Sequence, residues 1–193
     1  MSPMPPDATA VFIDGAYLDK LLAGPLAAPG GKPLFLDMKR LPAMLAGGAK
    51  PWRTFYYHAY PWVSDPPLPA EFALYERKRK AVEFLAREPR WVVRTGCVER
   101  RGGPKPGDWS YEQKRSDVQL AVDLVRLAWR GEISQAVLLA GDSDFVPAVE
   151  DARAAGVRVA VRAWVGRVHE DLLAACDDRA LLAADALQAL ARS

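Results

Sequence analysis

Residues 137–161 read VLLAGDSDFVPAVEDARAAGVRVAV, and this stretch decides the fold. The stretch begins with one apolar run and ends with another, and each run predicts a buried strand. The segment between them, 145–155, predicts a helix. A strand, a helix and a strand in this order predict a right-handed unit with parallel strands. Asp142 and Asp144 follow the first strand, at the end where a parallel sheet carries its working site.

The same alternation of apolar runs and amphipathic segments continues along the rest of the chain. The predicted strands are residues 9–14, 52–60, 91–98, 135–140 and 157–163, and the predicted helices are residues 16–23, 37–46, 70–87, 116–130, 145–155, 169–175 and 181–191. Strands that alternate with helices predict an α/β fold, a three-layer α/β/α domain with a central, mainly parallel sheet. We expect one domain over residues 1–193, with a flexible N-terminus at 1–8 and a polar Gly/Pro loop on the substrate side at 99–113.

The composition fits a globular domain and argues against several other classes of protein. Half of the 193 residues are hydrophobic and the formal net charge is +2, whereas disordered chains combine low hydrophobicity with a high net charge. The two cysteines, Cys97 and Cys176, do not form a disulfide framework, which favours a cytoplasmic protein. No apolar run is long enough for a membrane helix, and the N-terminus lacks the pattern of a signal peptide.

The small net charge is the sum of two opposed blocks. Residues 76–105 hold ten Lys or Arg and four Glu, whereas residues 106–151 hold nine Asp or Glu and four Lys or Arg. The first block is therefore a candidate surface for a polyanion, and the second is a candidate site for cations.

Four aspartates fall where the predicted sheet would gather them. Asp14 follows the first strand, Asp142 and Asp144 follow the fourth, and Asp117 opens the helix before the fourth strand. We expect the first and fourth strands to be neighbours, which would bring these carboxylates to one crevice. Clustered carboxylates keep their protons unless a cation intervenes, and a site of oxygen ligands selects Mg²⁺ or Mn²⁺. Such an ion can activate water for in-line attack on phosphorus.

Each of these aspartates also has a simpler interpretation. Aspartate is common in turns and at helix N-termini, and Asp144 could cap the helix that begins at Phe145. The set as a whole favours a metal site, because its members follow two separate apolar strands. Asp123 lies about 120° around the helix from Asp117, so we expect it to support the structure or the ligands and not to bind the metal directly.

Four ordered stretches resemble the NYN domain family of PIN-like nucleases and, within it, the LabA-like or DUF88 group. They are VFIDGAYL (11–18), QKRSDVQLAVDL (113–124), VLLAGDSDFVPAVEDARAAGVRVAV (137–161) and LLAACD (172–177). The resemblance covers nearly the whole chain, and it implies a PIN-like, Rossmann-like fold and a metal-dependent ribonuclease. The residues that it implies as ligands of one or two Mg²⁺ or Mn²⁺ ions, and as the catalytic acids, are Asp14, Asp117, Asp142 and Asp144.

Three further residues, Tyr17, Ser143 and Asp123, are expected beside these acids. Many members of the family carry Asn three residues after the first aspartate, where this chain has Tyr17. An Asn amide could orient a bound water or a phosphate. Tyr17 offers a longer hydroxyl instead, or it is an aromatic residue of the core or its rim. The departure leaves the catalytic strength open.

A nuclease must hold a polyanion beside its own carboxylates. The candidate contacts to phosphates and bases are Arg77, Lys78, Arg100, Arg101, Lys105, Trp109, Lys114 and Arg115. Arg77 and Lys78 lie on a predicted helix whose charged face could equally be only solvated. The polar loop that leads to Asp117 favours a substrate contact more strongly. The expected partner is RNA, with single-stranded DNA as the alternative.

Two other functions and a dimer are alternatives. A regulatory module could keep the fold and bind RNA or a protein without cleaving it; the four acids disfavour this function, and Tyr17 mildly favours it. A phosphatase of the haloacid dehalogenase type needs a second Asp two residues after its nucleophile, and here Gly15 and Ala16 follow Asp14. The apolar helix at 181–191 could close the core or form a homodimer.

Overall fold

The computed structural model describes residues 8–27, 31, 34–102 and 109–191. In chain order its elements are β1 (Thr9–Asp14), α1 (Gly15–Ala23), α2 (Leu41–Leu45), β2 (Arg53–Ala59), α3 (Pro69–Ala86), β3 (Trp91–Gly102), β4 (Trp109–Lys114), α4 (Ser116–Trp129), β5 (Gln135–Leu139), the 3₁₀ turn η1 (Ser143–Phe145), α5 (Val146–Ala154), β6 (Arg158–Ala163), α6 (Glu170–Ala175), β7 (Asp178–Leu181) and α7 (Ala184–Gln188). Within these ranges, none of the helices has the length and apolar character needed to cross a lipid bilayer.

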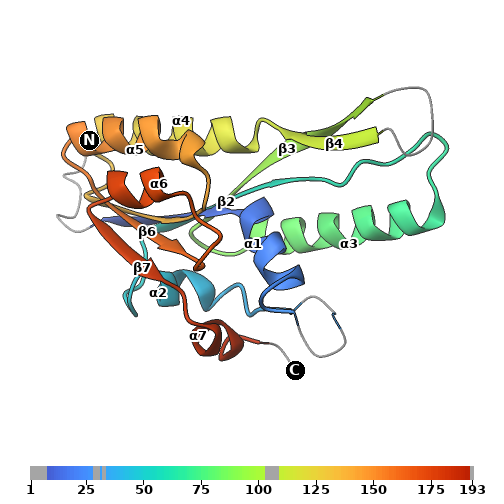
Figure 1. Cartoon of the computed structure of the whole chain (residues 1–193), viewed down its shortest axis with the longest axis horizontal. Coiled ribbons are helices and arrows are strands. Elements are labelled where there is room, and N and C mark those ends of the chain that lie inside the picture. The colour runs from blue at the N-terminus through green and yellow to red at the C-terminus, as the bar shows by residue number, and fades with distance from the viewer. Residues whose placement is uncertain (1–7, 28–30, 32–33, 103–108, 192–193) are drawn as a thin grey trace.

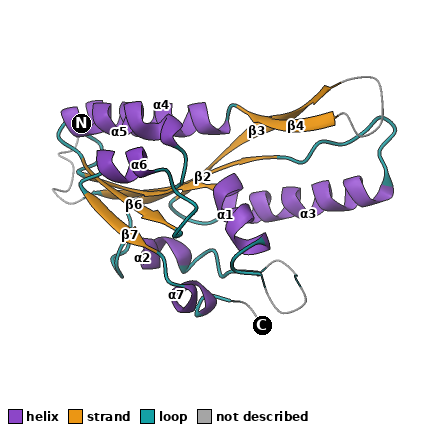
Figure 2. Ribbon diagram, in the orientation of Figure 1, coloured by secondary structure: helices purple, strands orange, loops and turns teal. Residues whose placement is uncertain are grey.

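The strands form one sheet in the order β4-β3-β2-β1-β5-β6-β7. Neighbouring strands are parallel except for β3 and β4, which are antiparallel. Figures 1 and 2 show α4, α5 and α6 on one face of the sheet and α1, α2, α3 and α7 on the other. The three-layer α/β/α fold with a mainly parallel sheet is therefore confirmed. The predicted pairing of the first strand with the fourth, β1 with β5, is confirmed as well, and the strand order reverses between these two.

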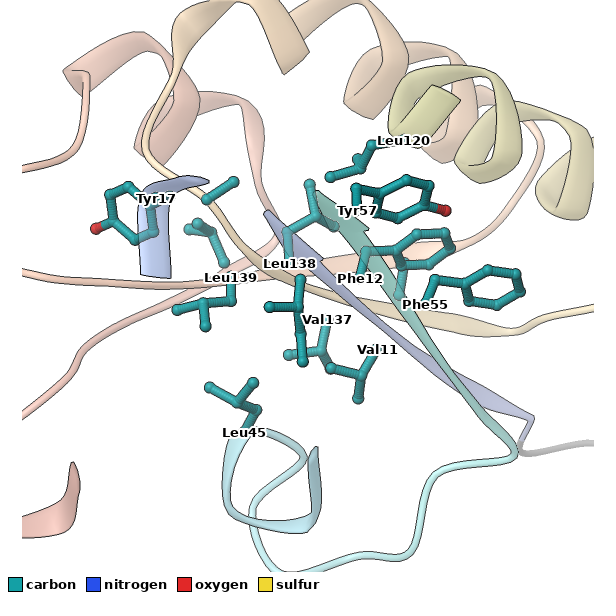
Figure 3. Packing of buried hydrophobic residues seen from close by; sticks show 14 of the residues in the cluster. Val11, Phe12, Tyr17, Leu45, Phe55, Tyr57, Leu120, Val137, Leu138 and Leu139 are labelled. Atoms are coloured by element: carbon teal, nitrogen blue, oxygen red, sulfur yellow. The ribbon is translucent and has the colours of Figure 1, made fainter. Parts of the chain in front are cut away.

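The centre of the sheet is apolar because β1 and β5 are apolar along their length. Phe12 and Ile13 of β1 and Leu138 and Leu139 of β5 are buried. The ring of Phe12 stacks on that of Phe55 in β2, with 5.1 Å between the ring centres (Figure 3). Parallel strands covered by helices on both faces need such continuous apolar runs, and each buried large side chain contributes about 1.5–3 kcal/mol.

The predicted loop at 99–113 is wrong, because most of this segment belongs to a β-hairpin. β3 pairs with β2 as far as Gly96, and it then pairs with β4 from Cys97 to Gly102. Figure 1 shows the hairpin and α3 extending in the same direction beyond the body of the sheet, and we call this extension the arm. A two-stranded ribbon has no core of its own to bury, so its strands carry no apolar alternation that a sequence could reveal. Residues 103–108 lie outside the described residues.

The C-terminal segment differs from the predicted helix at 181–191. Leu181 ends the edge strand β7, and α7 spans only Ala184–Gln188. A short edge strand whose side chains are mostly exposed gives little signal in a sequence. Leu187 and Leu190 are buried, so the segment closes the core, which is the first of the two roles considered for it.

Two expectations for the N-terminal part change in detail. Asp37 accepts a hydrogen bond from the backbone N–H two residues later and makes a turn, so α2 begins only at Leu41. Ala8 was assigned to a flexible N-terminus but is buried, and its carbonyl oxygen accepts a hydrogen bond from the backbone N–H of Ser134. The rest of that segment, residues 1–7, lies outside the described residues.

One buried carboxylate, that of Asp123, ties α4 to the sheet. It accepts a hydrogen bond from the hydroxyl of Tyr57 at 3.0 Å and another from Nε of Arg94 at 3.1 Å. A guanidinium nitrogen of Arg126 donates to its other oxygen at 2.6 Å. These donors come from β2, β3 and α4 itself, so Asp123 holds three elements together. Both arginines reach solvent, whereas Asp123 is buried.

We expect Asp123→Ala to lower the free energy of unfolding by about 3 kcal/mol, because it leaves Tyr57 and two guanidinium groups without their shared partner. Urea denaturation followed by circular dichroism measures the change. Glu132→Ala is the matched control, since Glu132 makes only an exposed ion pair with Arg130 at 3.7 Å and should change stability by about 1 kcal/mol or less. Equal effects of the two substitutions would contradict the structural role of Asp123.

Candidate active site

Asp14 lies at the end of β1 and caps the helix that follows. Its Oδ1 accepts hydrogen bonds from the backbone N–H groups of Ala16 at 2.9 Å and Tyr17 at 3.1 Å. Burial raises the pKa of Asp14 to about 6; the two N–H groups oppose this shift and the charge of Asp117 adds to it. The cap therefore fixes the position of a carboxylate that is difficult to ionise.

Asp142 reaches the same edge of the sheet from β5. The parallel register pairs Ile13 with Leu139, so Asp14 stands one residue beyond this pair and Asp142 stands three beyond it. Oδ1 of Asp142 accepts a hydrogen bond from the backbone N–H of Asp144 at 3.0 Å and caps η1. The alternative in which Asp144 caps the following helix is wrong, because α5 begins at Val146 with Phe145 as its N-cap residue and no side-chain capping bond.

Asp117 comes to the site on the first turn of α4. The chain turns sharply out of β4 at Arg115, whose φ of 79° lies in the left-handed region that residues other than glycine rarely adopt. The turn passes close over Gly96 of β3, where a Cβ atom would lie 2.3 Å from the carbonyl oxygen of Lys114. A residue without a Cβ atom is therefore needed at Gly96. The turn fixes where α4 starts, and so it fixes the position of Asp117.

The charges of neighbouring acids act on Asp14 and on Asp117. Partial burial raises the pKa of Asp117, and the negative charges of Asp142 and Asp144 raise it further. The charge of Asp117 in turn contributes to the raised pKa of Asp14. The ammonium group of Lys20, on α1, opposes the shift at Asp14 and at Asp117. The fold therefore brings the four predicted residues close enough for their charges to interact.

These acids do not form a ready-made chelating group. In the ranges that the structure describes, no three Asp, Glu, His or Cys side chains are arranged so that they could hold a metal ion together. Oδ1 of Asp14 and Oδ1 of Asp142 are each occupied by backbone N–H groups. Three of the acids could share one ion only after their side chains move.

A pocket of about 440 Å³ opens at this edge of the sheet. Asp14, Asp142 and Ser143 contribute to its lining, as predicted residues of the site. Tyr17, which the sequence analysis placed beside the acids, lines the pocket as well. Three further charged or titratable lining residues were not selected from the sequence: Lys20, Arg167 and His169.

A sequence signal existed for part of this lining. Arg167 and His169 belong to the loop after β6, and the rule that a site lies beyond the carboxyl ends of parallel strands would have found that loop. Lys20 has no comparable signal, because a lysine on the exposed side of a helix is common.

Tyr17 holds the loop after β6 against the sheet. Its ring is buried, and its hydroxyl oxygen accepts a hydrogen bond from the backbone N–H of Trp164 at 2.8 Å. Figure 3 shows the ring at the edge of the hydrophobic cluster, with its hydroxyl pointing away from the other labelled residues. Gly141 permits this packing, since a Cβ atom there would lie 2.5 Å from the ring of Tyr17 and 2.3 Å from the carbonyl oxygen of Arg167. Tyr17 thus belongs to the core and its rim.

The arm carries most of the predicted nucleic-acid contacts, and several of them already interact with other residues of the protein, Lys78 and Arg100 among them. Lys78 forms an ion pair with Asp19 of α1, so a phosphate bound at Lys78 would compete with that carboxylate. The guanidinium of Arg100 lies 4.8 Å from the centre of the Trp62 ring, and that ring packs against Tyr111 at 5.6 Å. Arg100 therefore belongs to a small aromatic cluster on the hairpin.

The remaining predicted contacts are spread along the arm and the turn that follows it. Arg77 is exposed on α3, Arg101 lies on β3, Lys114 ends β4 and Arg115 makes the turn into α4. Lys105 and the side chain of Trp109 lie outside the described residues.

Comparison with known proteins identifies the family and the fold. A model of the NYN domain matches residues 8–182. The structure is similar to the crystal structure of a protein of unknown function from Vibrio parahaemolyticus, with a TM-score of 0.58 and 13% sequence identity over 96% of this chain and 98% of that chain. At this identity the likeness shows the fold alone. No protein with a curated description matches the sequence.

The raised pKa of Asp14 predicts an unusual dependence of stability on pH. Because the folded state binds the proton of Asp14 more tightly than the unfolded state does, the free energy of unfolding should fall as the pH rises from about 4 to about 6 and stay low above that. Asp14→Asn keeps the capping oxygen but cannot ionise. In a buffer with chelator at pH 7.5, we expect it to be more stable than the wild type by about 2–3 kcal/mol.

Urea denaturation of both proteins at several pH values measures this difference. Asp151→Asn is the control, because Asp151 is exposed on α5 and the variant should follow the wild-type pH profile. Identical stabilities of the wild type and Asp14→Asn at pH 7.5 would contradict the raised pKa of Asp14.

Proposed function

The chain belongs to the NYN domain family of PIN-like nucleases, and on that premise we propose that it is a metal-dependent endoribonuclease of the LabA-like or DUF88 group. It would hydrolyse phosphodiester bonds of RNA. The observation that carries the proposal is the meeting of Asp14, Asp117, Asp142 and Asp144 beyond the carboxyl ends of β1 and β5, where burial and, to a lesser extent, the charges of neighbouring acids raise the pKa of Asp14 and of Asp117.

The chemistry of these residues fits a hard divalent ion. All four donors are carboxylates, the oxygen ligands that favour Mg²⁺ or Mn²⁺ over zinc. Asp14 and Asp142 hold Oδ1 on backbone N–H groups, which leaves Oδ2 of each for an ion. We propose that one or two such ions bind to Asp14, Asp117, Asp142 and Asp144. When bound, the ion would act as a Lewis acid that polarises the phosphate and activates water.

The protein's own groups would position the phosphate. The capping N–H groups fix the carboxylates of Asp14 and Asp142 before any ion arrives, so little reorganisation of these two residues is needed. Lys20 and Arg167 line the same pocket and offer positive charge to the non-bridging oxygens of the phosphate. Ser143, between Asp142 and Asp144, lines the pocket with a hydroxyl group.

The arm would guide the RNA toward this pocket. Its arginines and lysines supply affinity for phosphates that does not depend on base sequence. Tyr111 is 52% exposed beside Trp62, so it offers a ring on which an unpaired base could stack. We therefore propose single-stranded RNA as the substrate, with single-stranded DNA as the alternative, and a cytoplasmic location, which the free thiols of Cys97 and Cys176 fit.

A module that binds RNA without cleaving it is the second candidate. Two observations favour it: Tyr17 is tied into the core where many family members carry Asn, and the acids in the described ranges do not yet form a chelating group. Cleavage itself distinguishes the two candidates. The phosphatase remains the weakest alternative, because Gly15 and Ala16 follow Asp14 and supply no second acid.

We expect Asp14→Asn and Asp142→Asn each to abolish Mn²⁺-dependent cleavage of labelled single-stranded RNA, because each removes a negative charge from the ion site at almost constant shape. Cleavage is followed on gels with Mg²⁺, with Mn²⁺ and with chelator, and circular dichroism checks that both variants fold. Asp151→Asn should cleave like the wild type. Full activity of both site variants would contradict the mechanism, and a wild type that binds RNA without cutting it would favour the binding module.

We also expect Arg100→Ala combined with Arg101→Ala to weaken RNA binding and to flatten its salt dependence. Each phosphate contact that is lost should reduce the slope of log affinity against log salt by about 0.7. Fluorescence anisotropy with a labelled oligonucleotide measures this slope. Arg158→Ala is the control, since Arg158 is exposed at the start of β6, away from the arm. An unchanged slope would show that these two arginines of the hairpin do not contact the RNA.

A further inference from the structure

His169 is held at the pocket by a tight contact between two loops. Its backbone N–H donates a hydrogen bond to the carbonyl oxygen of Gly141 at 2.9 Å. Gly141 directly precedes Asp142, so this bond joins the loop after β6 to the loop that carries an acid of the site. His169 accordingly lines the pocket that Asp14 and Asp142 also line.

The contacts of the imidazole determine which of its nitrogens can act. Nδ1 accepts a hydrogen bond from the backbone N–H of Asp171 at 3.2 Å, so in this neutral form the proton is on Nε2. The carboxylate of Asp171 lies 3.4 Å from the same Nδ1, and a protonated ring can donate to it there. Asp171 thus accommodates both charge states of the ring through Nδ1, which leaves Nε2 for a ligand.

The other titratable groups of the pocket are poorly suited to giving up a proton. Burial raises the pKa of Tyr17, and its hydroxyl oxygen already accepts a hydrogen bond from Trp164. Lysine and arginine side chains in general hold their protons tightly at neutral pH, so Lys20 and Arg167 serve better as fixed charges. The carboxylates are needed in the ionised form to hold a cation. Imidazole is the side chain that ordinarily gains and loses a proton near neutral pH.

The second histidine of the chain does not compete for this role. His58 is buried near the end of β2, and burial lowers its pKa to about 4. It does not line the pocket that contains Asp14.

We infer that His169 is the general acid of the cleavage reaction, an inference that rests on the proposed nuclease function. Water forms a bond to phosphorus, the bond from phosphorus to the leaving nucleoside oxygen breaks, and the imidazolium of His169 gives its Nε2 proton to that oxygen. The attacking water releases one proton to solvent, and the ring takes up one proton from solvent before the next turnover. After the transfer, the ring proton that remains is on Nδ1, which can donate it to the carboxylate of Asp171, and Nε2 is the nitrogen that takes up the next proton from solvent.

The test compares two substrates that differ in their need for a proton. When RNA is cleaved, the nucleoside oxygen leaves as a poorly stable alkoxide unless a general acid protonates it. Bis(p-nitrophenyl) phosphate instead releases p-nitrophenolate, which departs without a proton. His169→Asn keeps a side-chain oxygen that can cap α6, so the fold should be retained. We expect it to lower kcat on RNA by about 100-fold or more and to leave kcat on the nitrophenyl ester unchanged, both with Mn²⁺.

Glu170→Gln, the exposed neighbour of His169, is the control and should cleave both substrates like the wild type. An equal loss on both substrates in His169→Asn would indicate a structural role and overturn the inference. Unchanged cleavage of RNA would overturn it as well. If the wild type cuts neither substrate with Mn²⁺, the proposed nuclease function itself fails, and the inference falls with it.

Discussion

The parallel pairing of β1 with β5 is the constraint on which the rest of the molecule depends. These two strands form the apolar centre of the sheet, and the strand order reverses between them, so the loops that follow them diverge to opposite faces. That divergence opens a pocket beyond their carboxyl ends. The register of the pair places Asp14 and Asp142 beyond the same end of the two strands. A slip of this register would separate the acids and expose the core in the same step.

The acids at this edge serve two purposes that pull in opposite directions. As caps, Asp14 and Asp142 satisfy backbone N–H groups that would otherwise lack partners, and at Asp14 these bonds favour the charged form of the side chain. Burial and the charge of Asp117 act against the charged form of Asp14 and raise its pKa to about 6. Local structure therefore holds the carboxylate of Asp14 in place while burial and a neighbouring acid disfavour its ionisation. This is the condition in which a site gains most from a cation.

The sequence predicted the parts of the structure that burial dictates. The apolar runs of β1 and β5 and the aspartates that follow them are local patterns, and strand adjacency then followed from general rules of α/β topology. The hairpin of the arm escaped prediction because it buries no core. The contribution of His169 to the pocket escaped prediction because it depends on a close approach that only Gly141 permits, between loops far apart in the chain. Lys20 was missed because its partner acids are brought to it by the fold.

The bond between His169 and Gly141 also has a meaning for the order in which the protein is made. A ribosome releases β1 and its aspartate early, whereas β5, β6 and the loop that carries His169 emerge much later. Until then β1 lacks the neighbour that brings the second acid, and the pocket does not exist. Assembly of the complete pocket is therefore postponed until synthesis has passed β6.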